Sequence, residues 1–161
     1  MTIDFILNGE DVTVKAEPTD RLALILRDQF GLGSIVHDCG GGHCGKCMRL
    51  LDGRTALSCL VPVFRVRGSE VVTYEGFMNT AEHELVRTAF DESGLALCSY
   101  CAPARYMAAG SLLENSSRPT EPEVTETMSS VLCRCSPPLA VIRVVMAALE
   151  QNENRKYRRA R

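Results

Sequence analysis

Four cysteines between residues 39 and 59 constrain this chain more than any other feature. They are Cys39, Cys44, Cys47 and Cys59, with the spacing C-x4-C-x2-C followed by a fourth cysteine after eleven further residues. This is the plant-type spacing for holding a [2Fe–2S] cluster through four thiolates. Such a cluster carries net negative charge, so its loop needs backbone N–H donors and little side-chain bulk. The residues that meet this need are Gly40, Gly41, Gly42 and Gly45. A zinc site or a pair of disulfides is the alternative use of the four thiols.

The composition of the chain limits the classes of protein to which it can belong. Its 161 residues are 45% hydrophobic and 24% charged, which is typical of globular proteins and allows one domain or two small ones. The first residues lack a basic and apolar leader, and no apolar run reaches membrane length. We therefore expect a cytoplasmic protein without a membrane partner, in which clustered cysteines bind metal. An acidic body with a short basic tail over 155–161 argues against a nucleic-acid partner.

The first 76 residues show the alternation and turns of a small sheet. Strands are expected over 3–7, 12–14, 47–51, 55–57 and 71–74. Asn8-Gly9 and Asp52-Gly53 are hairpin turns, and the second hairpin returns Cys59 to the loop with the other three cysteines. A helix capped by Thr19 lies between the hairpins. Two hairpins, one helix and a final strand predict a β-grasp domain over 1–76, the architecture of plant-type ferredoxins.

After Gly76 the pattern becomes helical. Helices are expected near 79–93, 103–113, 120–132 and 137–149, with a polar linker over 115–119. Asn79 with Glu82, and Thr120 with Glu123, resemble capping boxes, and Ser136 is a candidate cap for the last helix, with Leu139 on its buried side. These helices fit a four-helix bundle domain over 77–161, which gives the chain an α+β fold class.

The loops between these helices carry four more cysteines. They are Cys98 and Cys101, spaced as CxxC, and Cys133 and Cys135, spaced as CxC. Zinc is a fair rival for such a set. The iron–sulfur module expected in the first half favours a second [2Fe–2S] cluster here, because two nearby clusters can transfer electrons in two successive steps. The flanking His37 and His43 are not expected to be ligands, since all four cysteines of the first site are present.

Taken together, these motifs resemble the small iron–sulfur subunit of the molybdenum hydroxylases, the family of xanthine dehydrogenase, aldehyde oxidoreductase and carbon monoxide dehydrogenase. The matching segments are 39–47, 51–54, 58–59, 98–101 and 132–135, with every ligand spacing intact. The resemblance implies a ferredoxin-like domain followed by a helical bundle, each with one [2Fe–2S] cluster. It departs at Leu97, where the family usually has a Gln that touches the pterin.

The resemblance also implies partners and a direction of electron flow. The cluster at Cys98, Cys101, Cys133 and Cys135 would face the molybdopterin of a large subunit. The cluster at Cys39, Cys44, Cys47 and Cys59 would face the FAD of another subunit. The chain itself offers no Walker loop, dinucleotide motif or nucleophile–base pair, so we expect the assembled heteromeric oxidoreductase, not this chain, to hold the substrate site. The alternative function is a freestanding two-cluster ferredoxin-like electron carrier.

Overall fold

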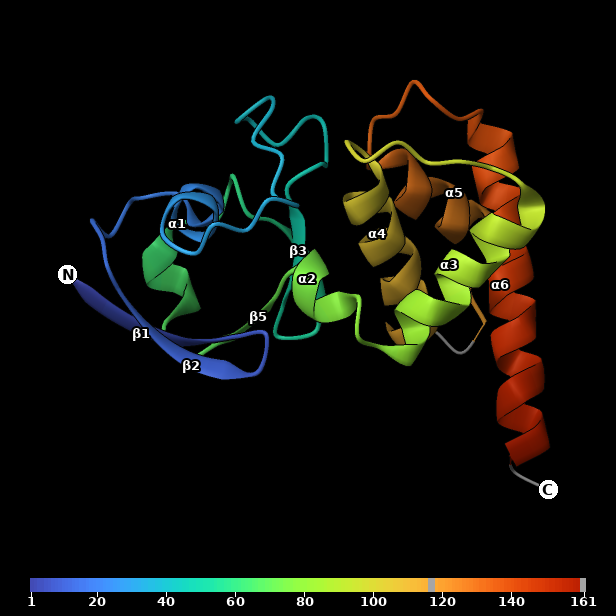
Figure 1. Cartoon of the computed structure of the whole chain (residues 1–161), viewed down its shortest axis with the longest axis horizontal. Coiled ribbons are helices and arrows are strands. Elements are labelled where there is room, and N and C mark those ends of the chain that lie inside the picture. Colours follow the sequence, from blue (N-terminus) through green and yellow to red (C-terminus); the bar gives the residue numbers. More distant parts are fainter. Residues whose placement is uncertain (116–117, 160–161) are drawn as a thin grey trace.

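Five strands form one mixed sheet in the order β2-β1-β5-β3-β4, in a computed structural model that describes residues 1–115 and 118–159 (Figure 1). The strands are β1 (Thr2–Leu7), β2 (Glu10–Lys15), β3 (Met48–Leu51), β4 (Arg54–Leu57) and β5 (Glu70–Val72). Both predicted hairpins are present, with Ile3 opposite Val14 and Met48 opposite Leu57. Their turns, Asn8-Gly9 and Asp52-Gly53, have positive φ at both residues, the geometry that matches the twist of the strands.

Helix α1 (Leu22–Asp28) and a 3-10 turn, η1 (Val63–Val66), pack on the sheet through buried aliphatic side chains. The expected cap at Thr19 is wrong, because the residue preceding the helix is Arg21 and it makes no capping side-chain bond. The last strand is also shorter than expected. Asn8 Oδ1 accepts the backbone N–H of Thr73 at 2.8 Å, which ends the strand pairing, and Tyr74 begins the short helix α2 (Tyr74–Phe77).

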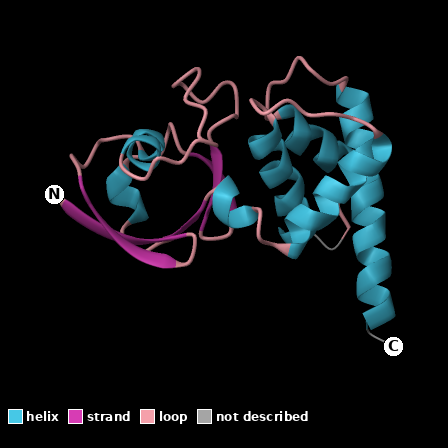
Figure 2. Cartoon of the chain, viewed as in Figure 1, coloured by secondary structure: helices cyan, strands magenta, loops and turns pink. Residues whose placement is uncertain are grey.

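Helices α3 (Ala81–Ser93), α4 (Ala102–Asn115), α5 (Glu121–Ser129) and α6 (Pro138–Arg159) surround a shared hydrophobic core (Figure 2). The capping box at Thr120 and Glu123 is confirmed. The first cap lies one residue later than expected, since the Thr80 side chain, not Asn79, accepts the N–H of His83. In the predicted linker, residues 116–117 lie outside the described residues, as do 160–161 of the basic tail.

The start of α6 differs from the sequence-based expectation. Ser136 does not cap it, because its hydroxyl donates to the Ala96 carbonyl at 3.1 Å and the first helical bonds go to Pro137. Leu139, expected on the buried side, is 68% exposed. The helix meets the core from its second turn onward, where Ile142 and Val145 are buried.

Strand β3 joins the two halves of the molecule. Met48 lies in the core of the helical half, while Leu50 packs with Phe77 and Met107 in a smaller cluster between the halves. Gly110 of α4 is required there, because a Cβ at this position would overlap the ring of Phe77. The mixed α+β class is confirmed. Within residues 1–115 and 118–159, no helix combines the length and apolarity needed to cross a bilayer.

Candidate metal centres

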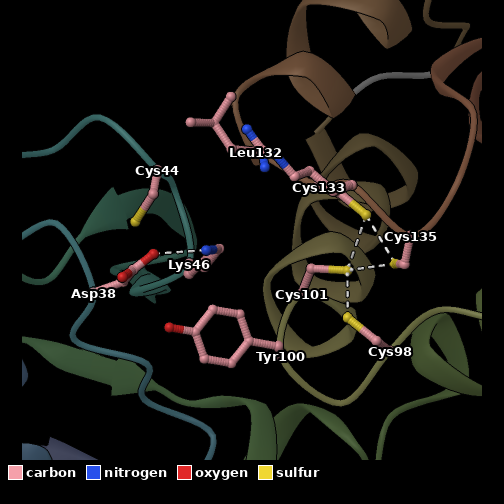
Figure 3. A pocket seen from close by; sticks show the side chains of 10 residues that line it. Asp38, Cys44, Lys46, Cys98, Tyr100, Cys101, Leu132, Cys133 and Cys135 are labelled. Atoms are coloured by element: carbon pink, nitrogen blue, oxygen red, sulfur yellow. Dashed lines mark hydrogen bonds and ion pairs between the residues drawn. The ribbon is translucent and has the colours of Figure 1, made fainter.

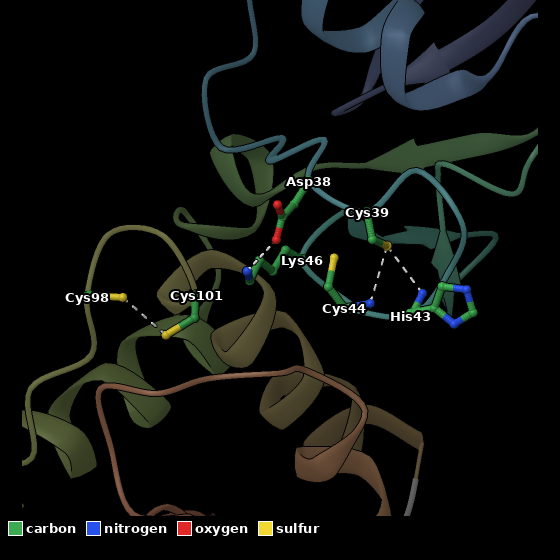
Figure 4. A network of polar contacts seen from close by, with 7 residues as sticks. All are labelled: Asp38, Cys39, His43, Cys44, Lys46, Cys98 and Cys101. Carbon is green, nitrogen blue, oxygen red and sulfur yellow. Dashed lines mark hydrogen bonds and ion pairs between the residues drawn. The ribbon is translucent and has the colours of Figure 1, made fainter.

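The loop over 37–47 directs backbone N–H groups at the sulfur of Cys39. Cys39 Sγ accepts from the backbone N–H of His43 at 3.3 Å and of Cys44 at 3.4 Å (Figure 4). Hydrogen bonds from the Gly41 and Cys44 backbones lower the pKa of Cys39 to about 6. Positive φ at three loop glycines lets the chain wrap in this way. The loop is therefore built to stabilise an anionic sulfur.

The β3–β4 hairpin brings Cys59 back to this loop, as the spacing predicts. Ser58 donates to the Cys47 carbonyl through its N–H at 3.2 Å and its hydroxyl at 2.7 Å, which holds the two flanking cysteines together. Burial, followed by the hydrogen bond to Cys47, raises the pKa of Cys59 to about 11. Cys59 also interacts with the charge of Cys39, and Cys39 interacts with Cys44. The structure thus places Cys39 close to Cys44, and Cys59 close to Cys47, in the same part of the molecule.

The second set of cysteines is gathered more tightly at one end of the helices. Cys101 Sγ lies 3.5 Å from the sulfur of Cys98, 3.2 Å from that of Cys133 and 3.4 Å from that of Cys135 (Figure 3). The sulfurs of Cys133 and Cys135 are 3.0 Å apart. Burial raises the pKa of Cys101, whereas a hydrogen bond from Cys133 lowers the pKa of Cys135 to about 6. Four converging sulfurs make a thiolate donor set.

The two cysteine loops face each other across a cavity of about 640 Å³. Lys46 stands in it, with its Nζ 2.6 Å from Asp38 Oδ2 and 4.3 Å from the centre of the Tyr100 ring. The backbones also meet, because the N–H of Leu132 donates to the Cys44 carbonyl at 2.9 Å. Gly45 allows this approach, since a Cβ there would overlap the Ser130 carbonyl. The sequence did not reveal this contact between residues 88 positions apart.

The residues present fit iron–sulfur clusters. Thiolates are the ligands that [2Fe–2S] clusters take, and backbone N–H groups directed at sulfur suit their negative charge. All eight cysteines are free, and each sulfur of the second set lies 3.0–3.5 Å from a neighbouring sulfur. The pair-of-disulfides alternative for the first site is therefore wrong in this structure. Zinc takes the same sulfur donors, and metal analysis distinguishes the two.

One charged residue near the first site was missed by the sequence analysis. Arg49 of β3 is only 1% exposed, and burial lowers its pKa to about 10. Its guanidinium donates to Ser34 Oγ at 3.2 Å and to the Met48 carbonyl. The only sequence signal was a charged residue inside an apolar strand, which ordinarily indicates a solvent-facing position.

Comparison with known proteins agrees with this arrangement. A 2Fe-2S iron-sulfur cluster binding domain matches residues 5–68, and a [2Fe-2S] binding domain matches residues 73–155. The nicotinate dehydrogenase small FeS subunit of Eubacterium barkeri is 34% identical over 96% of this chain and 98% of its own. The xanthine dehydrogenase iron-sulfur-binding subunit of Escherichia coli O157:H7 is 32% identical over 91% of this chain and 92% of its own.

A solved structure shows the same fold over the whole chain. The crystal structure of quinoline 2-oxidoreductase from Pseudomonas putida 86 contains a chain that superposes with a TM-score of 0.83. The two chains are 29% identical, and the match covers 96% of each. With two consecutive iron–sulfur domain matches and relatives aligned along nearly their full length, the chain belongs to the family of small iron–sulfur subunits of the molybdenum hydroxylases.

Proposed function

We propose that this chain is the electron-transfer subunit of a molybdenum hydroxylase-type oxidoreductase. It carries electrons from a molybdopterin centre on a large subunit, through two [2Fe–2S] clusters, to FAD on another subunit. The observation that carries this proposal is the hydrogen bond between Leu132 and Cys44, which joins the loop with three cysteines of the first site to the loop that carries Cys133 and Cys135 of the second. Two sulfur sites held face to face within one chain suit a relay.

The ligands proposed for the first cluster are Cys39, Cys44, Cys47 and Cys59. Those proposed for the second are Cys98, Cys101, Cys133 and Cys135. The convergence of four sulfurs within 3.0–3.5 Å of a neighbour supports the second set, and the hydrogen bonds and charges that connect the thiols support the first. When bound, each cluster supplies a one-electron redox centre whose potential depends on hydrogen bonds to sulfur, local charge and exposure.

The residues around the two sites set those conditions. Backbone N–H groups of His43 and Cys44 stabilise negative charge on Cys39. Lys46, paired with Asp38, holds a positive charge in the cavity between the sites. Leu132 and Cys44 fix the separation of the two loops. The protein therefore controls distance and electrostatics and leaves the substrate chemistry to its partners.

Exposed cysteines at each site support two docking faces. Cys39 is exposed at the first site, and Leu60, packed over Gly42, is 59% exposed beside it. Cys98 and Cys135 are exposed at the second site. We assign the first face to the partner that holds FAD and the second face to the partner that holds molybdopterin. The two halves would then be a β-grasp domain over 1–76 and a four-helix bundle domain over 77–161, in a cytoplasmic complex.

Purification under anaerobic conditions tests the proposal. Two irons and two sulfides per cluster predict about four of each per chain, in a complex with larger molybdenum- and flavin-binding chains. A persistent monomer with the same iron content would favour the freestanding carrier instead. Zinc with no visible absorbance would overturn both functions, because zinc does not change its redox state.

A further inference from the structure

The Arg49 guanidinium is a buried positive charge on strand β3. Within residues 1–115 and 118–159, no carboxylate lies within ion-pair distance of it, and its Nε has no hydrogen-bond partner. Its other contacts are the Ser34 hydroxyl, the Met48 carbonyl and the sulfur of Met107 at 4.0 Å. Burying an unpaired cation is costly in free energy. A negative electrostatic potential nearby would lower this cost.

The nearest acid is held one hydroxyl away from Arg49. The Glu75 carboxylate accepts from the Ser34 N–H at 3.0 Å and from the Ser34 hydroxyl at 2.8 Å. It also accepts from the Thr73 hydroxyl at 2.8 Å. Burial opposes ionisation of Glu75, but these hydrogen bonds outweigh it, so its pKa is lowered and it is charged at neutral pH. The Ser34 hydroxyl thus lies between the two charged groups and forms a hydrogen bond with each of them.

Arg49 is also close to the proposed first cluster. It lies two residues after Cys47 along the chain, and it interacts electrostatically with Glu75 and with Cys47. An iron–sulfur cluster is an anion whose negative charge increases on reduction. A buried cation beside it favours the reduced form, and weak screening in the interior strengthens this effect. The partly buried carboxylate of Glu75, which shares the Ser34 hydroxyl with Arg49, acts in the opposite direction.

We propose that Arg49 is a positioning residue that raises the reduction potential of the cluster at Cys39, Cys44, Cys47 and Cys59, and that Glu75 partly offsets it. The inference rests on the proposed function, because it requires a cluster at these cysteines. By raising its potential, Arg49 would make the first cluster a better electron acceptor. Electrons would then be drawn across the cavity toward the FAD side.

A redox titration followed by EPR tests this on the full chain with both clusters bound, with dithionite as the reductant. Arg49→Met removes the charge and keeps much of the side-chain volume. We expect it to reduce the equilibrium constant for reduction of the first cluster about tenfold, a shift of about 59 mV toward lower potential. Glu75→Gln keeps the hydrogen-bonding shape and removes the opposing charge, so it should shift the same cluster toward higher potential.

Three comparisons make the test specific to charge. Arg49→Lys retains the charge without the planar fork and should stay within about threefold of the wild-type equilibrium constant. Arg54→Met removes an exposed guanidinium from the neighbouring strand, where water screens it, and should produce no shift. The second cluster serves as an internal reference and should keep its potential in every variant.

The outcomes separate this inference from the function on which it rests. Opposite shifts in Arg49→Met and Glu75→Gln support it, whereas shifts of the same sign, or none, overturn it. If Arg49→Met does not fold, Arg49→Gln takes its place, because it also removes the charge and should likewise shift the first cluster toward lower potential. Absence of iron and sulfide from the wild-type chain would instead defeat the proposed function.

Discussion

The backbone N–H of Leu132 donates a 2.9 Å hydrogen bond to the carbonyl oxygen of Cys44. Leu132 directly precedes Cys133, so this single bond connects a peptide at the first site to a peptide at the second. Through it, a short series of covalent bonds and one hydrogen bond runs from one set of sulfurs to the other. The bond depends on the close approach of two loops that are far apart in the sequence.

Gly45→Ala should disrupt that approach. The residue has φ of +71°, and its new Cβ would overlap the Ser130 carbonyl beside Leu132. We expect the free energy of unfolding to fall by about 2–4 kcal/mol, because both backbone strain and overlap must be relieved. Anaerobic denaturant unfolding of the cluster-bound chain measures the loss.

Gly68→Ala is the matched control for this substitution. Gly68 has the same φ of +71°, but a Cβ there meets nothing within 4 Å. Its cost should be about 1 kcal/mol, the backbone strain alone. Equal losses in the two variants would contradict the role assigned to the contact between the loops.

Cys133→Ser should remove one EPR signal and leave the other. The sulfur of Cys133 lies 3.2 Å from that of Cys101 and 3.0 Å from that of Cys135, but the first cysteine set does not depend on it. Cys47→Ser is the reciprocal variant and should remove the other signal. Loss of both signals from a chain that circular dichroism shows to be folded would argue against two independent sites.

Removal of the clusters should lower the melting temperature. Each proposed cluster would connect separate segments of the chain, and ligand binding to the native state is linked to its stability. A loss of about 5 kcal/mol corresponds to a fall of about 10–20 °C for a chain of this size. Anaerobic calorimetry before and after chelation measures it, and an unchanged melting temperature would count against structural cluster sites.

His83 should make stability depend on pH in the acid range. Burial, followed by the charge of Arg87, lowers the pKa of His83, whose ring nitrogen lies 3.1 Å from the Tyr74 hydroxyl. As pH falls, the unfolded chain therefore binds a proton at this histidine before the folded chain does. The contribution of neutral His83 to stability is complete above about pH 6.5, and it is lost as pH falls from there through the lowered folded-state pKa. Unfolding free energies between about pH 5.5 and about pH 8 measure this dependence.

The control for that titration is His83→Gln, which retains an acceptor for Tyr74 and cannot be protonated in this range. Its unfolding free energy should vary less with pH than that of the wild type below about pH 6.5. Parallel pH profiles for the two proteins would show that His83 does not contribute the expected dependence.

Local patterns predicted most of the elements, because hairpin turns and helical periodicity depend on neighbouring residues. Asn8-Gly9 and the box at Thr120 are such cases. Predictions failed where a hydrogen-bonding group took a partner far away in the sequence instead of the local one. Ser136 bonds to Ala96 instead of capping α6, and Asn8 takes the Thr73 N–H and ends the last strand.

The spacing of the cysteines indicated two groups of thiols, and the sulfurs of Cys98, Cys101, Cys133 and Cys135 do lie together at one end of the helices. The spacing did not predict that the two loops would touch, because the Leu132–Cys44 bond depends on how the two halves pack. The buried position of Arg49 was hidden for the same reason. Its neighbours Ser34, Glu75 and Met107 come from three separate segments.

Strand β3 has one practical consequence for anyone who wishes to study a single redox centre. Cys47 packs with the sheet core, while its neighbour Met48 fills the helical core. Cutting the chain near residue 76 would therefore remove Met48 from the core of the helices. It would also expose Met48 and Leu50 of the sheet to solvent. Isolating one centre is better done by replacing the sulfur ligands of the other and leaving the polypeptide whole.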